Sequence, residues 1–87
     1  MNYYIYLLKS LKNNKIYVGY TSKSPKERLT QHNFGSNQWT RANKPFKLLY
    51  YEKFYCKTDA QRRETFLKSG VGNKLVKIIA KYYKPGL

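Results

Sequence analysis

The chain is poor in the residues from which disulfides and metal clusters are built. It has one cysteine, Cys56, one histidine and four acidic residues among its 87 residues. A single cysteine excludes a disulfide within the chain and a cysteine cluster for zinc. Long apolar runs and basic amphipathic anchors are also lacking, so the sequence favours neither a membrane span nor a membrane anchor. Met1 precedes a predicted strand rather than a basic and apolar leader, so we expect no signal peptide and a cytoplasmic protein.

Positive charge, by contrast, is abundant. Lys and Arg together number 18, which gives a formal net charge of +14. Such an imbalance opposes compactness and favours a polyanionic partner. Nucleic acid is the first candidate, because neutralisation of its backbone by Lys and Arg supplies most non-specific affinity. A membrane surface is the second candidate, and a ribosome-like scaffold protein would also account for the charge.

Residues 3–8 and 15–20 are rich in β-branched and aromatic side chains. Turn-prone residues 11–14 separate them, which predicts a β-hairpin. Because side chains of a strand alternate between faces, one face is apolar and the other phenolic. The apolar face carries Ile5, Leu7, Ile16 and Val18, and the phenolic face carries Tyr4, Tyr6, Tyr17 and Gly19. Gly19 leaves space beside Tyr17. The phenolic face is interpreted either as a polar pocket or as ordinary half-buried strand tyrosines.

The remaining segments predict an α+β fold, in which a small three-stranded antiparallel sheet is flanked by helices in the order β-β-α-β-α-α. One domain covers residues 1–87. The expected helices are 25–33, about 58–69 and 73 onward, and the third strand is 46–54. That strand is apolar on both faces, which is typical of a central strand. Residues 38–45 are expected to form a loop.

Capping signals support these boundaries. Ser24 and Glu27 form a capping box around Pro25 at the first helical position, and Gly35 suits the end of that helix. Thr58 and Gln61 predict a second capping box. Asn73 is interpreted either as an N-cap or as a ligand contact.

Two groups of side chains have the character of a binding surface. Arg28 and His32 are four residues apart and share one helix face. Trp39, Arg41 and Lys44 form a basic and aromatic mixture suited to a phosphate backbone or a base. The alternative for these last three is a surface loop anchored by Trp39.

Glu64 is an unusual carboxylate for so basic a chain. It lies next to the inward apolar stripe of the helix predicted near residues 58–69. A functional role would explain why a carboxylate lies at this position. The structural alternative is an ion pair with Arg62, Arg63 or Lys68.

Taken in order, these residues resemble the GIY-YIG nuclease superfamily. Residues 4–6 read Tyr-Ile-Tyr and, after ten intervening residues, residues 17–19 read Tyr-Val-Gly. The helix with Arg28 and His32 is similar to the family's next motif. Residues 58–68 resemble its glutamate helix, and Asn73 matches a position often held by Asn. Tyr4 stands where the family name has Gly, a change that could narrow the pocket.

The resemblance covers nearly the whole chain and looks closest to small stand-alone, single-domain bacterial members. It implies metal-dependent hydrolysis of phosphodiester bonds, in DNA more than in RNA, with Glu64 holding Mg²⁺ or Mn²⁺. One carboxylate can suffice, because Mg²⁺ keeps several waters and takes phosphate oxygens as further ligands. Strong sequence specificity would require a homodimer or a protein partner.

Roles for the individual residues follow from this resemblance and from their chemistry. Tyr17 is expected to activate the attacking water, since nearby cations favour its phenolate. Tyr6 would orient the network, and Arg28 would bind phosphate and offset developing charge. His32 would relay a proton or hold Tyr17. The expected nucleic-acid contacts are Asn73, Lys15, Lys23, Arg41, Lys44 and Trp39.

Two other function classes compete with a nuclease. A nucleic-acid-binding module without catalysis would have the same charge and aromatics, but an inward Glu64 would repel phosphate unless a metal intervened. A structural or assembly protein would explain the charge. It would not explain the combined presence of Tyr6, Tyr17, Arg28, His32 and Glu64.

Overall fold

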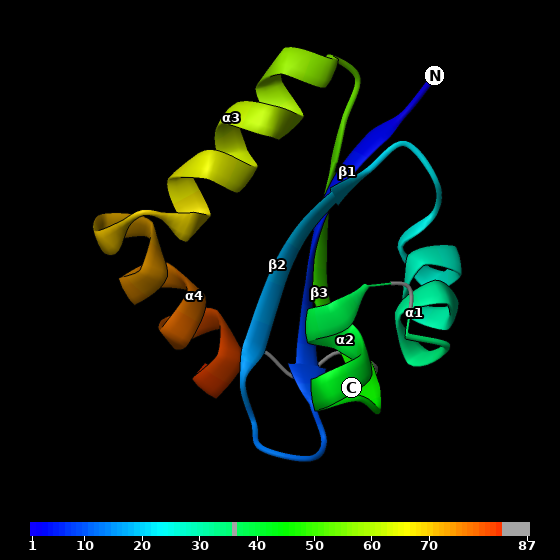
Figure 1. The fold of residues 1–87 in the computed structure, drawn as a ribbon. Coiled ribbons are helices and arrows are strands. Elements are labelled where there is room, and N and C mark those ends of the chain that lie inside the picture. The colour runs from blue at the N-terminus through cyan, green and yellow to red at the C-terminus, as the bar shows by residue number, and fades with distance from the viewer. Residues whose placement is uncertain (36, 83–87) are drawn as a thin grey trace.

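A computed structural model describes residues 1–35 and 37–82 and places a three-stranded antiparallel sheet between two pairs of helices (Figure 1). The elements are β1 Tyr3–Ser10, β2 Ile16–Thr21, α1 Pro25–Asn33, α2 Gln38–Asn43, β3 Phe46–Phe54, α3 Lys57–Lys68 and α4 Gly70–Tyr82. The predicted α+β class is confirmed, together with the bounds of the first helix and of the third strand. None of the helices in these described ranges is long and apolar enough to cross a membrane.

The central strand of the sheet is β1. The strand order is β2-β1-β3, so the prediction that residues 46–54 form the central strand is wrong. Four consecutive side chains of β1 are 0–1% exposed: Ile5, Tyr6, Leu7 and Leu8. Burial of an apolar side chain stabilises a fold by roughly 1.5–3 kcal/mol, so β1 contributes much of the core of this small domain.

The alternation predicted for the hairpin separates two hydrophobic clusters. On one face, Ile5, Leu7 and Val18 pack with Leu67 of α3 and Val76 of α4. On the opposite face, a second cluster is built from Tyr6, Leu8 and Phe46, with Tyr17, Leu29, Trp39 and Leu48 packed against it. The α3 and α4 helices therefore cover the apolar face, and α1 and α2 cover the phenolic face (Figure 1).

Gly19 is required by the close approach of Tyr6. The two residues are directly opposite each other on β2 and β1. A Cβ atom at position 19 would lie 2.3 Å from Tyr6 Cζ and 2.4 Å from its hydroxyl oxygen. The space predicted beside Tyr17 is thus filled by the Tyr6 phenol, which crosses above the Gly19 backbone.

The hairpin turn is tied to the end of α2 by a buried serine. Ser10 Oγ donates to the Asn43 carbonyl oxygen and accepts from the backbone N–H groups of Lys12 and Asn13. Asn13 Nδ2 also donates to Asn43 Oδ1 at 2.6 Å. These bonds hold α2, which carries Trp39, against the hairpin.

Residues 38–45 contain the helix α2, so the prediction of a loop there is wrong. Asn37 and Thr40 form a reciprocal capping box. The Asn37 side chain accepts from Thr40 N at 2.8 Å, and the Thr40 hydroxyl accepts from Asn37 N at 3.1 Å. These bonds satisfy two backbone donors that a short helix would otherwise leave unpaired. The positive φ of +80° at Gly35 confirms the predicted end of α1.

The predicted caps of the last two helices are also wrong. α3 begins at Lys57 after Cys56, without a side-chain cap, so Thr58 is not an N-cap. α4 begins at Gly70, and Asn73 lies in its first turn, donating its backbone N–H to the Ser69 carbonyl at 2.8 Å. Ser69 Oγ instead accepts from Gly72 N at 3.1 Å, so the capping group lies four residues before Asn73.

Candidate active site

Tyr6, His32 and Arg28 form a hydrogen-bonded set on the phenolic face of the sheet. The Tyr6 hydroxyl lies 2.8 Å from His32 Nε2, and Arg28 Nη2 lies 3.4 Å from the same nitrogen. α1 presents Arg28 and His32 together because they are one turn apart. Tyr6 and His32 are both buried, so packing restricts these two side chains, whereas Arg28 is half-buried.

The protonation of the set follows from the donors around His32. A guanidinium can only donate, so the contact with Arg28 Nη2 favours the neutral imidazole that carries its proton on Nδ1. In that tautomer the Tyr6 hydroxyl donates to Nε2. Burial, assisted by the charge of Arg28, lowers the pKa of His32 from 6.5 to about 4. Burial also raises the pKa of Tyr6 above 10.0, although Arg28 opposes this. Both side chains are neutral at pH 7, which favours positioning over proton relay.

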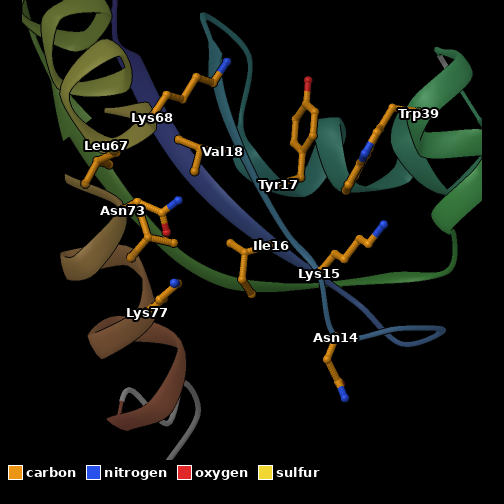
Figure 2. Close-up of a pocket in the computed structure, with 11 residues that line it drawn as sticks. Asn14, Lys15, Ile16, Tyr17, Val18, Trp39, Leu67, Lys68, Asn73 and Lys77 are labelled. Carbon is orange, nitrogen blue, oxygen red and sulfur yellow. The ribbon is translucent and has the colours of Figure 1, made fainter. Parts of the chain in front are cut away.

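Tyr17 lies at the centre of a row of rings beside this set. Its ring centroid is 4.9 Å from that of His32, 5.2 Å from that of Trp39 and 6.2 Å from that of Tyr6. Trp39 in turn stacks on Phe46 at 5.5 Å. The ring of Tyr17 is therefore held on two sides, and its hydroxyl points away from the β2 backbone (Figure 2).

Arg28 is a half-buried cation without a carboxylate partner in the described part of the chain. Its Nη1 donates to Gln31 Oε1, and its Nε is buried without a hydrogen-bond partner among residues 1–35 and 37–82. The ion pairs within residues 1–35 and 37–82 join Arg63 to Glu52 and Lys68 to Glu64. Burying an uncompensated charge is unfavourable, so an anion next to Arg28 would be stabilised.

Glu64 lies on α3, the helix that packs against β1 and β2. It forms an ion pair with Lys68 Nζ at 3.2 Å, with 23% of the Glu64 side chain exposed. The structural alternative of a Lys68 pair is thus present, whereas Arg63 binds Glu52 at 2.9 Å. The charge of Glu64 nevertheless contributes to raising the pKa of Tyr6. Glu64 is also partly open to solvent.

A groove of about 660 Å³ runs beside Tyr17 across β2. Figure 2 shows the Tyr17 and Trp39 rings on one side of β2, and Asn73 and Lys77 of α4 on the other. The complete lining consists of Asn14, Lys15, Ile16, Tyr17, Val18, Trp39, Leu67, Lys68, Asn73, Val76 and Lys77. Three predicted nucleic-acid contacts, Lys15, Trp39 and Asn73, therefore meet at one surface.

The other predicted contacts lie outside this groove. Lys23 and Lys44 are exposed. Arg41 is exposed as well, with Nη1 donating to the Gly35 carbonyl at 3.1 Å. Sequence reasoning missed Lys68 and Lys77 as groove residues. Lys68 follows Glu64 by four positions and Lys77 follows Asn73 by four, so helical spacing was the available signal.

The neutral, buried His32 predicts a loss of stability in mild acid. The unfolded chain binds the imidazole proton near pH 6.5, whereas the folded chain binds it near pH 4. Between these values the unfolded state carries more protons, so the free energy of unfolding falls as the pH drops from about 6.5 to 4. The loss is at most about 3.5 kcal/mol, at about 1.4 kcal/mol per pKa unit. Thermal melts across this range measure it.

His32→Gln is the matched control, since this chain has one histidine. The variant should lose the part of the pH dependence between about 5 and 6.5, where carboxylates are already ionised. Identical pH profiles for the two proteins would contradict a buried, neutral His32.

Comparisons with known proteins identify the family of this chain. The family model of the GIY-YIG catalytic domain matches residues 2–77. A UPF0213 protein of Clostridium perfringens is 37% identical over 78 residues, covering 88% of this chain and 82% of the relative. One of Staphylococcus haemolyticus is 35% identical over 78 residues, covering 88% and 93%. The solution NMR structure of a UPF0213 protein from Bacillus halodurans is similar, with a TM-score of 0.58, 30% identity and coverage of 98% of this chain and 89% of that one.

Proposed function

Because the chain belongs to the GIY-YIG nuclease family, we propose that it is a divalent-metal-dependent endonuclease that hydrolyses phosphodiester bonds in nucleic acid, with DNA favoured over RNA. The observation that carries the proposal is the half-buried Arg28, which has no carboxylate partner in the described residues and adjoins the Tyr6 and His32 pair. Such a cation suits the scissile phosphate, because it stabilises charge that develops in the transition state.

Four of the five candidate residues act on the phosphate and the attacking water, and the fifth, Glu64, is the candidate metal ligand. Arg28 binds the phosphate. Tyr17, whose hydroxyl points away from the sheet, acts as phenolate, takes the proton of the attacking water and becomes the neutral phenol. His32 fixes the Tyr6 hydroxyl through the bond at Nε2. Tyr6, which stays protonated, orients the groups around Tyr17. The buried rings restrict these side chains, so little ordering is needed when substrate binds.

The carboxylate of Glu64 is the kind of oxygen ligand that a hard divalent cation binds. In residues 1–35 and 37–82 no three His, Cys, Asp or Glu side chains are grouped to hold a metal. Mg²⁺ does not require such a group, since it commonly binds through one or two carboxylates, waters and substrate phosphates. When bound, it would stabilise negative charge on the scissile phosphate and its leaving oxygen. Lys68 must leave Glu64, and a partly exposed i,i+4 pair costs only about 0.3–0.5 kcal/mol to break.

The alternative is a nucleic-acid-binding module without catalysis. Incubation with single-stranded, double-stranded and branched DNA and with RNA, in Mg²⁺, in Mn²⁺ and with chelator, separates the two. Metal-dependent products with new ends support the nuclease. Binding of every substrate without cleavage in either metal contradicts it.

Binding itself is expected to be strongly dependent on salt. With a net charge of +14, several phosphates should be neutralised on contact. The logarithm of the binding constant should then fall linearly with the logarithm of the salt concentration, with a slope of roughly −0.7 to −0.9 per neutralised phosphate. Equilibrium titrations at several salt concentrations without metal measure this slope. A flat response would remove nucleic acid as the main partner.

A further inference from the structure

The groove beside Tyr17 has a mixed chemistry that cleavage alone does not require. Its floor is apolar and is formed by Ile16 and Val18 of β2, Leu67 of α3 and Val76 of α4. Its rim carries the amines of Lys15, Lys68 and Lys77 and the amide of Asn73. The Tyr17 and Trp39 rings close one end (Figure 2).

This combination selects an anionic ligand that also has a flat apolar part. The groove lining contains three lysines and no acidic residue. Lys68 is paired with Glu64, so Lys15 and Lys77 supply the net positive charge of the rim. Phosphates suit the lysine rim, and a nucleobase suits the floor and the rings, because every base has a face that stacks on aromatic side chains. The volume lies within the usual range for small-ligand pockets, about 300–1,000 Å³.

A paired duplex cannot use this surface fully. Its base faces are covered by stacking, and only base edges and phosphates are presented to a protein. An unpaired nucleotide, in contrast, presents a base face and a phosphate together. Single strands are recognised in this way, with a basic groove along the backbone and rings against the bases.

We propose that this groove binds unpaired nucleotides adjacent to the scissile phosphate, so that the substrate is a single strand or a duplex carrying an unpaired strand. The proposal rests on the proposed nuclease function for the position of the scissile phosphate. Tyr17 provides that link, because it lines the groove and also packs on His32 of the catalytic set at 4.9 Å.

The base-dependent part of binding is tested without metal, by filter binding with three oligonucleotides of equal length. These are a single strand, the same strand with abasic sites at its central positions, and a blunt duplex. The intact strand should bind at least about five-fold more tightly than the abasic strand, at the low end of the range for stacking of one base. The two strands should share one salt slope, because they carry the same phosphates. The intact single strand should also bind more tightly than the blunt duplex. Equal affinity for intact and abasic strands would overturn the proposal.

A pair of lysine variants on α4 tests the place of binding. Lys77 lines the groove, whereas Lys74 is exposed on the same helix and does not line it. Lys77→Gln should weaken binding of the single strand several-fold and reduce its salt slope by about 0.7. Lys74→Gln removes the same charge and should have a clearly smaller effect. Equal losses in the two variants would show diffuse electrostatic binding and would overturn the assignment to this groove.

The results of the binding and cleavage experiments distinguish a failure of this inference from a failure of the proposed function. Metal-dependent cleavage of a blunt duplex, with no dependence of binding on bases, would overturn the groove assignment and leave the nuclease standing. Base-dependent, Lys77-sensitive binding without cleavage in Mg²⁺ or Mn²⁺ would support the groove and contradict the nuclease.

Discussion

Replacing Glu64 with glutamine is expected to abolish cleavage while the protein stays folded. The substitution keeps the size of the side chain and removes the charge that a hard cation needs. Binding of intact nucleic acid without metal should be unchanged or tighter, because the variant is one charge more positive. The melting temperature should change little, since the pair with Lys68 is partly exposed and worth about 0.3–0.5 kcal/mol. Cleavage, metal-free binding and thermal melts on one preparation measure all three.

Glu27→Gln is the matched control for this experiment. Glu27 is an exposed glutamate in the first turn of α1, so the control removes the same charge from another surface. It should cut at the wild-type rate. If Glu64→Gln proves destabilised and still cuts at the wild-type rate per folded molecule, Glu64 is a structural ion-pair residue and not a metal ligand.

Replacing Tyr17 with phenylalanine is expected to lower the cleavage rate roughly 10²-fold or more, the usual scale for an acid–base group. The ring contacts with His32 and Trp39 remain in this variant, and only the hydroxyl is lost. The melting temperature should therefore stay close to that of the wild type. Single-turnover cleavage at saturating enzyme measures the rate without a contribution from binding.

Tyr6→Phe gives the contrasting result. It deletes the buried hydrogen bond to His32, so it should destabilise the fold by about 1 kcal/mol or more while slowing cleavage less than Tyr17→Phe does. Tyr20 lies on β2, as Tyr17 does, but its ring stacks on Tyr3. Tyr20→Phe is therefore the control for the loss of a phenol hydroxyl from β2. Wild-type cleavage by Tyr17→Phe would rule out the water-activating role.

Local signals in the sequence predicted a large part of this fold. The period-two pattern of the hairpin assigned Ile5 and Tyr6 to opposite faces, and these residues do lie in separate clusters. Ser24 caps α1 as predicted, accepting from Glu27 N at 3.2 Å. Such signals are readable because they involve residues only a few positions apart.

Features set by tertiary contacts could not be read in this way. β3 is as apolar as a central strand, yet the sheet places β1 in the middle, where it pairs on both sides. α2 has only six residues, and a helix this short depends on its cap and on the packing of Trp39. Lys44 was grouped with Trp39 by proximity in the chain, and the fold keeps it out of the groove.

The candidate site shows the same division. Helical spacing predicted that Arg28 and His32 would share a face, and both lie within reach of Tyr6. The choice of Tyr6 rather than Tyr17 as the hydrogen-bond partner of His32 depends on the close fit over Gly19, which has no signature in composition or spacing. The sequence allows an ion pair of Glu64 with Arg62, Arg63 or Lys68, and only the three-dimensional structure distinguishes Lys68 as the partner.

The stacking of Trp39 between Tyr17 and Phe46 also gives this molecule an intrinsic optical reporter. Trp39 is the only tryptophan in the chain, so selective excitation of the indole gives fluorescence that reports on one end of the groove. We therefore expect its emission to change both on unfolding of α2 from the sheet and on binding of a ligand at the Tyr17 ring. A titration and a denaturation curve can thus be recorded on unlabelled, unmodified protein.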